Sequence, residues 1–436
     1  MSDTLPDSHA PETTGRFIVT FREGGQSDAL AALKKGAGVA KSRLMSSAEF
    51  SDAGLNLEQL PDEGGVILEH LGIAVLRMDD AAAGTMAQDA GDDSAILAIE
   101  PEGIMYALGD TPAGGLSADY LRGFRDAADM LYRRATGAAE DDAMGAEIAA
   151  AFADSTAFTW GLQATKVATS RYTGKGIKVA VLDTGLDLKH PDFTGRSIVS
   201  RSFISGVASA QDGHGHGTHC TGTACGPRRP GVGRRYGVAY GAQIFIGKVL
   251  SDAGSGSDLG ILAAIDWAVA NKCHIISMSL GADVNSTSVA YETAGQRALN
   301  AGTLIVAAAG NNAQRSAGNF GFVGRPANSR TFMAVGALDA NLRMGNFSAR
   351  DTVRTAGTGV DIGGPGVAVY SAWPMPTRTR SLNGTSMATP HVAGIAALWA
   401  QASGDRGAAL WQRLITTARA LPLPVVDCGR GIVQAP

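Results

Sequence analysis

The second half of the chain repeats one pattern, in which a short apolar run leads into a glycine-containing turn and then into a stretch of helical composition. The apolar runs are six or seven residues long, at residues 176–182, 243–249, 275–280, 303–308 and 332–337. Runs of this kind are typical of parallel strands that are buried on both faces. Helical stretches lie between them, at residues 217–225, 258–271 and 288–301. The alternation predicts an α/β fold with a doubly wound, mostly parallel sheet.

Residues 17–108 follow a different pattern, in which short apolar segments interleave with two helical stretches. The expected strands are residues 17–21, 64–69, 72–78 and 95–100, with a further one at 103–107. The expected helices are residues 27–35 and 81–90. This order predicts a small α+β domain, with one sheet covered on one face by two helices.

Two segments fit neither pattern. Residues 1–16 are polar and contain proline, so we expect a disordered lead-in. Residues 109–155 are rich in alanine, glycine and charge, and they predict a helical linker. The pattern leaves open whether this linker is a solvated spacer or a helix that packs on the next domain. The parallel-sheet domain then occupies residues 156–436.

Composition and charge restrict the partners. The 37 basic and 41 acidic residues give a net charge of −4, and no block of like charge occurs, which argues against nucleic acid or a membrane surface as a partner. No apolar stretch approaches the ~18 residues of a membrane span. The first residues lack the features of a secretory signal, which predicts a cytoplasmic protein but leaves export by another route open. The 4 cysteines have no metal-binding spacing, and we expect buried thiols, or one disulfide if the protein is exported.

A carboxylate stands at the end of the first parallel strand, in Asp183-Thr184-Gly185. By itself, such a triplet is more often an aspartate that caps a turn than a catalytic group. The same triplet occurs in aspartic proteases, but these need a second copy and a different fold class.

Three histidines follow within six positions, in residues 213–219 (GHGHGTH). A metal site is disfavoured, because the segment lacks the HExxH frame and its glycines would make a loose chelate. The glycines instead allow a ligand to approach a histidine at a helix N-terminus, which favours His216 as a general base.

A serine opens an alanine-rich helix in residues 383–394 (NGTSMATPHVAG). A single serine at this position is usually a helix cap. Together with Asp183 and His216, however, Ser386 completes a nucleophile, a base and an orienting carboxylate from three loops at one sheet edge. The helix N-terminus adds a backbone N–H where an oxyanion would form.

Two further features fit nucleophilic attack on a peptide. Asn311 lies in the turn that follows the predicted strand at residues 303–308. At this sheet edge its side-chain amide can donate to an oxyanion. Two segments carry little side-chain bulk, as expected of edges that bind an extended peptide between them. They are Gly254, Ser255 and Gly256, and Ser279, Leu280 and Gly281.

Residues 160–434 resemble the subtilisin family of serine proteases, including its branch similar to proteinase K. The resemblance rests on VAVLDTG, GHGTHCTGT, AAAGNN and NGTSMATPHVAG, in that order. It implies a triad of Asp183, His216 and Ser386, with Asn311 in the oxyanion hole. It also implies that Ala308, Ala309 and Gly310 line the primary specificity pocket. Residues 226–235 contain four arginines and no carboxylate, so the calcium site common in this family is not expected there, and no cofactor is implied.

The same resemblance extends to residues 17–108, which are similar to an inhibitory prodomain in size and element order. It implies a serine endopeptidase made as a self-inhibited zymogen, with residues 103–108 in the substrate cleft. The partners are then a peptide or protein substrate and the protein's own prodomain. Two alternatives remain at this point: a maturation protease dedicated to one peptide, or an inactive protease-like binding protein.

Overall fold

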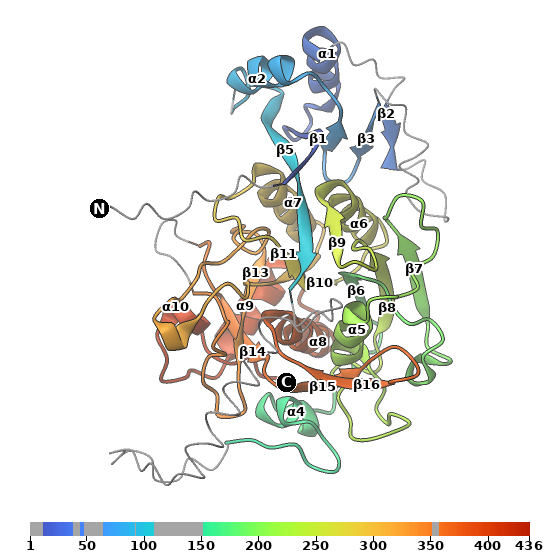
Figure 1. The fold of residues 1–436 in the computed structure, drawn as a ribbon, viewed down its shortest axis with the longest axis vertical. Helices are drawn as coiled ribbons and strands as arrows, with labels where there is room; N and C mark the ends of the chain where they lie inside the picture. Colours follow the sequence, from blue (N-terminus) through green and yellow to red (C-terminus); the bar gives the residue numbers. More distant parts are fainter. Residues whose placement is uncertain (1–11, 38–43, 48–63, 92, 109–150, 351–356) are drawn as a thin grey trace, which may run out of the picture.

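The computed structural model describes residues 12–37, 44–47, 64–91, 93–108, 151–350 and 357–436 (Figure 1). A small part, residues 12–108, sits on one side of a larger part that begins at residue 151. Most of the expected lead-in and of the expected linker falls outside the described residues.

The larger part is built on a seven-stranded sheet whose pairs are all parallel. Its strand order is β14 (Ile362–Pro365), β13 (Met333–Leu338), β12 (Leu304–Ala308), β10 (Ile275–Met278), β6 (Lys178–Asp183), β8 (Gln243–Lys248) and β7 (Ile198–Ser202). The five predicted strands are confirmed, and β7 and β14 are additions at the two edges.

Helices cover both faces of this sheet, as a doubly wound fold requires. The two faces are distinct along β6, where Val179 and Val181 pack in one apolar cluster and Ala180 and Leu182 in another. The first cluster includes α5 (His216–Cys225) and α8 (Thr385–Ser403), and the second includes α6 (Asp258–Ala270) and α7 (Val289–Asn300). The other elements of this part are α4 (Trp160–Ala164), α9 (Gly407–Thr417), α10 (Val425–Cys428), and the hairpin of β15 (Val369–Ala372) and β16 (Thr379–Leu382).

The small part is the predicted α+β domain. Its sheet has the order β5 (Ile96–Ala107), β1 (Thr13–Phe21), β4 (Ile73–Leu76), β3 (Gly65–Leu68) and β2 (Leu44–Ser46). Helices α1 (Gln26–Ala37) and α2 (Asp80–Gln88) cover one face, where Phe21 and Leu33 are fully buried. The opposite face, with Ile18 and Val75, packs into the same apolar cluster as α6 and α7.

Three boundaries differ from the sequence prediction. Strand β1 begins at Thr13, so the lead-in ends four residues earlier than expected. The two expected strands at 95–100 and 103–107 are one continuous strand, β5, because no turn interrupts them. The larger part begins before residue 156, since the Phe152 amide donates to the Ala340 carbonyl and Asp154 pairs with Arg234.

Strand β5 joins the two parts. Beyond its pairing with β1, its last residues pair antiparallel with β9 (Ser255–Ser257) and with β11 (Leu280–Gly281). In Figure 1 it runs down from the small domain between these two strands. The end of the small domain is therefore a strand of the larger one.

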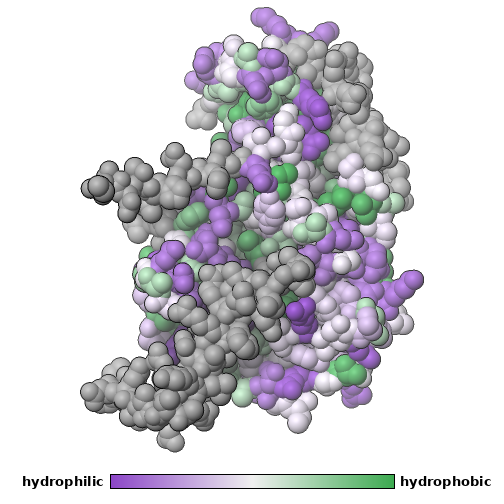
Figure 2. All heavy atoms as spheres, viewed as in Figure 1, coloured by the Kyte–Doolittle hydropathy of each residue, from purple (hydrophilic) through white to green (hydrophobic). Residues whose placement is uncertain are grey.

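The cysteines match the expectation from their spacing. All four cysteines are free and buried, as predicted. Within the described ranges, no helix is long and apolar enough to cross a membrane. On the face seen in Figure 2, hydrophobic residues form small patches separated by polar ones, so no broad apolar surface is visible there.

Candidate active site

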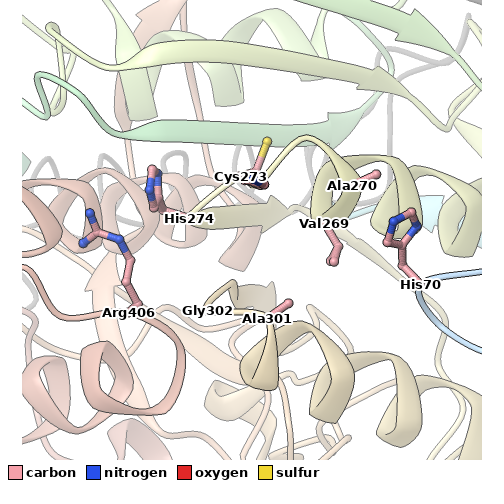
Figure 3. Close-up of a pocket in the computed structure, with 9 residues that line it drawn as sticks. His70, Val269, Ala270, Cys273, His274, Ala301, Gly302 and Arg406 are labelled. Carbon is pink, nitrogen blue, oxygen red and sulfur yellow. The ribbon is translucent and has the colours of Figure 1, made fainter. Parts of the chain in front are cut away.

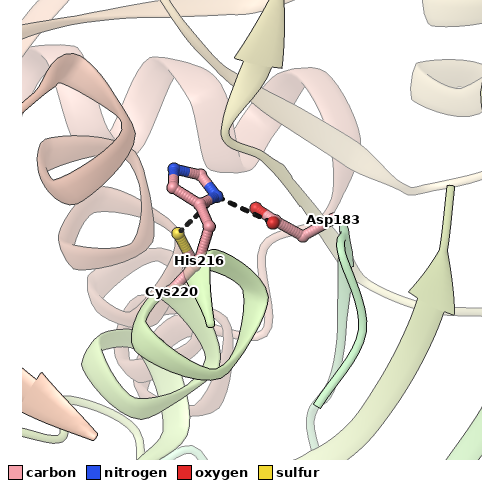
Figure 4. A group of neighbouring side chains, drawn as sticks. All are labelled: Asp183, His216 and Cys220. Atoms are coloured by element: carbon pink, nitrogen blue, oxygen red, sulfur yellow. Dashed lines mark hydrogen bonds and ion pairs between the residues drawn. The ribbon is translucent and has the colours of Figure 1, made fainter. Parts of the chain in front are cut away.

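Asp183 and His216 form a buried pair at the carboxyl edge of the large sheet (Figure 4). Asp183 is the last residue of β6, and His216 is the first residue of α5. The two residues are only 1% exposed, and His216 Nδ1 lies 2.7 Å from Asp183 Oδ1. His216 Nε2 is buried and has no partner. The Asp183 contact orients the ring and leaves Nε2 as the free nitrogen.

The neighbours of His216 decide its protonation. Burial alone would lower the pKa of the imidazole, but the negative charge of Asp183 and the hydrogen bond to it outweigh burial and hold the pKa well above 6.5. Cys220 Sγ lies 3.9 Å from His216 Nδ1, and burial raises the pKa of this thiol, which keeps it neutral. Asp183 is thus the group that stabilises the imidazolium.

Ser386 lies in the first turn of α8 and is fully buried. Its hydroxyl donates to the Ser279 carbonyl at 3.1 Å, and the Ser279 hydroxyl donates to the Ser386 carbonyl at 2.8 Å. Cys220 Sγ contacts the Ser386 carbonyl at 3.6 Å as well as His216. The structure therefore gathers the three predicted residues at one place, with the serine hydroxyl turned toward Ser279 and not bonded to His216.

Asn311 is held beside the start of the same helix. Its Oδ1 accepts from the Thr385 amide at 3.0 Å and from the Thr385 hydroxyl at 2.9 Å. These two bonds fix the orientation of the amide, so that its Nδ2 group points away from Thr385 and can donate to another acceptor. A Cβ on Gly384 would lie 3.4 Å from this Nδ2 and 3.0 Å from the Leu108 carbonyl oxygen. The end of the small domain thus brings a peptide carbonyl to Gly384, the residue that Asn311 Nδ2 also borders.

Both predicted peptide-binding segments, residues 254–256 and 279–281, contact the end of β5 and Leu108. The amide of Ala107 donates to the Gly254 carbonyl at 2.9 Å, and the amide of Leu108 donates to the Ser279 carbonyl at 3.3 Å. The ladders pair Tyr106 with Ser255 and with Gly281, Met105 with Gly256, and Ala107 with Leu280. All six residues predicted to bind peptide lie along the end of β5 and Leu108. Residues 103–108 are called the bound segment below.

Glycine is required where the bound segment passes closest. A Cβ on Gly281 would lie 3.0 Å from Leu108 Cδ1 and 2.8 Å from the Arg325 carbonyl oxygen. At Gly256 a Cβ would meet the Val249 carbonyl oxygen at 2.0 Å. Any larger residue would therefore push against the backbone that borders the cleft.

Ala308 ends strand β12, Ala309 and Gly310 follow it at the same sheet edge, and all three are buried. Gly310 has a φ of +122°, and its amide lies 3.3 Å from the Thr385 hydroxyl. These residues therefore connect the Asn311 turn with the start of α8.

The three histidines of residues 213–219 have separate surroundings. His219 Nε2 bonds to the Val369 carbonyl at 2.9 Å, and burial lowers the pKa of its ring to about 3, which fits a structural role. The His214 ring packs edge-on to His216 at 6.2 Å between centroids. The sequence did not point to Cys220 or Thr385, whose positions depend on the packing of α5 and α8.

One cluster of possible metal ligands in the described part of the chain is Asp183, His216 and Cys220, whose ligand atoms lie within 4.8 Å of one another. The donor set does not suit a resident metal, because Asp183 and His216 are hydrogen-bonded to each other and burial raises the pKa of the thiol, which keeps it neutral. This cluster is better suited to proton transfer than to metal binding.

One residue of the arginine-rich segment 226–235, Gly231, bonds to a buried carboxylate, that of Asp192. Its Oδ1 accepts from the Gly231 amide at 3.0 Å and from Arg378 Nη2 at 2.9 Å, and its Oδ2 accepts from the Tyr236 hydroxyl at 2.6 Å. Burial raises the pKa of Asp192, but these donors outweigh it and lower the pKa. Both oxygens have proton donors, so this anchor does not require a cation from solution.

A hollow of about 430 Å³ lies far from this site (Figure 3). It is lined by His70, Cys273, His274 and Arg406, at the end where β10 begins. The Asp183–His216 pair lies beyond the end where the parallel strands finish. The hollow is therefore on the opposite edge of the sheet.

Comparison with known proteins places the larger part among proteases. The profile of the Subtilase family matches residues 174–431. Subtilisin DY of Bacillus licheniformis is 41% identical over 238 residues, which are 54% of this chain and 81% of that protein. Subtilisin Savinase of Lederbergia lenta is 44% identical over 243 residues, 55% of this chain and 82% of that protein. M-protease of Shouchella clausii is 44% identical over 243 residues, but these are only 58% of its length.

The His216 environment predicts a pH dependence of peptide hydrolysis. A protonated imidazole cannot accept a proton, so kcat/KM should fall as the pH decreases through the pKa of His216, above 6.5. Asp183→Asn should move this acid limb to lower pH, because it removes the charge that raises the pKa. The measurement is kcat/KM for one peptide between about pH 5 and about pH 9. A flat profile would exclude His216 as the titrating base.

The Asp192 anchor predicts that chelators do not inactivate the protein. EDTA should leave the rate of peptide hydrolysis and the melting temperature unchanged, whereas Arg378→Met should lower the melting temperature by a few degrees, because it removes a donor from a buried carboxylate. Thermal unfolding with and without EDTA tests both. A large loss of activity in EDTA would contradict this account of the segment 226–235.

Proposed function

Because this chain belongs to the Subtilase family and is a serine endopeptidase, we propose that Asp183, His216 and Ser386 are its catalytic triad, and that the small domain is the inhibitory prodomain of a zymogen. The observation that carries the proposal is the end of β5, which lies between β9 and β11 and is followed by the Leu108 carbonyl at Gly384, where Asn311 Nδ2 also lies close.

In the proposed mechanism Ser386 Oγ attacks the carbonyl carbon of the scissile bond and transfers its proton to His216 Nε2. The free Nε2 and the Nδ1–Asp183 contact support this assignment, since the ring is held with its second nitrogen available. The imidazolium then protonates the leaving amine, and water hydrolyses the acyl-enzyme with His216 as base.

The negative charge of the tetrahedral intermediate needs donors at the carbonyl oxygen. Asn311 Nδ2 and the Ser386 backbone N–H, at the N-terminus of α8, are the proposed donors. Thr385 supports this role because its two bonds fix the Asn311 side chain with its oxygen turned away from the substrate. In subtilisin itself, loss of such an amide lowers kcat by about 10²–10³-fold.

The bound segment also indicates the substrate class. With the Leu108 carbonyl at Gly384, the bond that follows Leu108 is the proposed processing site, and Leu108 occupies the primary specificity pocket. Met105 is 1% exposed within an apolar cluster, whereas Tyr106 is 42% exposed. We therefore expect extended segments with apolar residues at the first and fourth positions before the scissile bond to be the best substrates.

The central test uses the full chain with Ser386→Ala. The unchanged protein should be cut after Leu108 on incubation, and the variant should stay intact, because it lacks the nucleophile but loses no core volume. Mass spectrometry measures the products, and circular dichroism verifies the fold. Ser381→Ala, at an exposed serine of β16, is the matched control and should be processed normally. Processing of Ser386→Ala at a comparable rate would disprove the triad.

The inhibitory role predicts an effect of residues in the bound segment. Residues 1–108, added to the processed enzyme, should inhibit it, and Met105→Asp should raise the inhibition constant at least ~100-fold, because an unpaired carboxylate would enter an apolar cluster. Thr85→Ala, at an exposed position of α2, is the control and should inhibit normally. If a folded Met105→Asp fragment inhibits as well as the original, the segment does not act by occupying the cleft.

A further inference from the structure

The backbone ladder between the bound segment and β9 continues through a side chain. The ladder pairs Ile104 with Ser257, the last residue of β9, and helix α6 begins at the next residue, Asp258. At this point the helical backbone turns away from the bound segment. The amide of Gly103 donates instead to Asp258 Oδ2, at 2.7 Å. The carboxylate thus provides the next acceptor along the edge.

Asp258 is fixed in this position by the neighbouring helix. Its Oδ1 accepts from the Tyr291 hydroxyl of α7 at 2.7 Å, and both side chains are fully buried. The carboxylate makes no cap for its own helix, since its two oxygens bond to Tyr291 and Gly103, and the N-cap residue Ser257 makes no side-chain cap either. Capping of the helix by its own side chain, a common reason for an acidic residue in a first helical turn, therefore does not explain the position of Asp258.

The approach of the bound segment at this point is close. A Cβ on Gly103 would lie 3.3 Å from Asp258 Oδ2. Burial raises the pKa of Asp258 to about 6, against the lowering effect of its bonds to Tyr291 and Gly103. A buried acceptor of this kind is costly to leave without a donor, so its bond to a peptide N–H discriminates strongly between ligands that supply one and ligands that do not.

We propose that Asp258, held by Tyr291, forms a substrate subsite for the sixth residue before the scissile bond, and that it recognises the backbone N–H of that residue. The numbering rests on the proposed function, in which Leu108 is the first residue before the bond and Gly103 is therefore the sixth. The substrate class is then an extended segment of at least six residues on that side of the bond. A residue without an N–H at the sixth position is disfavoured.

The subsite predicts a dependence on one hydrogen atom of the substrate. The test compares two peptides with the same chromogenic leaving group, acetyl-Gly-Ile-Met-Tyr-Ala-Leu and its analogue with N-methylglycine in place of glycine. They have the same length and side chains, but the second lacks the N–H that Asp258 would accept. With enzyme processed from the full chain, kcat/KM should be about tenfold higher for the glycine peptide, as expected for one hydrogen bond to a charged group.

Variants assign this preference to Asp258. In Asp258→Ala the ratio of the two kcat/KM values should fall below about twofold, and in Asp258→Asn, which keeps an acceptor oxygen, it should be intermediate. Asp266→Asn is the matched control, because Asp266 lies on the same helix and contacts His70 and Leu71, not residues 103–108. Its ratio should equal that of the unchanged enzyme. The ratio is measured on one enzyme preparation, so it does not depend on the folded fraction.

Two results would overturn the subsite. One is a ratio near one in the unchanged enzyme, and the other is an equal ratio in the unchanged enzyme and in Asp258→Ala. If Asp258→Ala does not fold, the ratio in Asp258→Asn and in Tyr291→Phe decides, because both change the acceptor with little change of volume. Failure of the unchanged enzyme to cleave either peptide is a different outcome, which would contradict the proposed function and the subsite with it.

Discussion

The hydrogen bonds made by the last residues of β5 join the small domain to the candidate site at the edge of the large sheet. The strand belongs to the sheet of the small domain through β1, and to the cleft through β9 and β11. A rigid strand that is fixed at one end by a folded domain delivers its other end to a defined place. The position of the Leu108 carbonyl at Gly384 therefore depends on the pairing of β5 with β1 in the small domain as well as on the strands of the cleft.

The large sheet sets the other side of this encounter. All its pairs are parallel, so the ends of β6 and β12 lie at one edge, and α5 and α8 start there. Helix N-termini concentrate backbone N–H groups and positive potential, which suits a buried carboxylate and the proposed nucleophile and oxyanion. The protein thus needs few specialised side chains, because the fold itself aligns the groups.

This arrangement explains what the sequence could and could not predict. Strands β6, β10 and β12 were predictable because their residues are apolar on both faces. The positions of the four proposed site residues could be inferred from the sequence because these residues follow such strands or begin helices. Strand β7 (IVSRS) and strand β14 (IGGP) were missed because most residues of the first are polar and half of the second is glycine. Cys220, Thr385 and Asp258 were missed for another reason: their roles depend on contacts with residues far away in the sequence.

Buried carboxylates between the two parts explain how the register of the bound segment is set. Glu102 Oε1 accepts from the Leu259 amide at 2.8 Å at the start of α6, while its Oε2 contacts Arg16 of β1 at 2.5 Å, and Asp258 accepts from Gly103. A slip of one residue would turn Glu102 to the opposite face, and a slip of two would remove it from the α6 N-terminus. Either slip would take the Leu259 amide away from Glu102 Oε1 and leave that oxygen of a fully buried carboxylate without its donor, which costs free energy even though Arg16 still pairs with Oε2. The ladder of β5 with β9 and β11 would tolerate several registers on its own, so the charged side chains select the one that places the Leu108 carbonyl at Gly384.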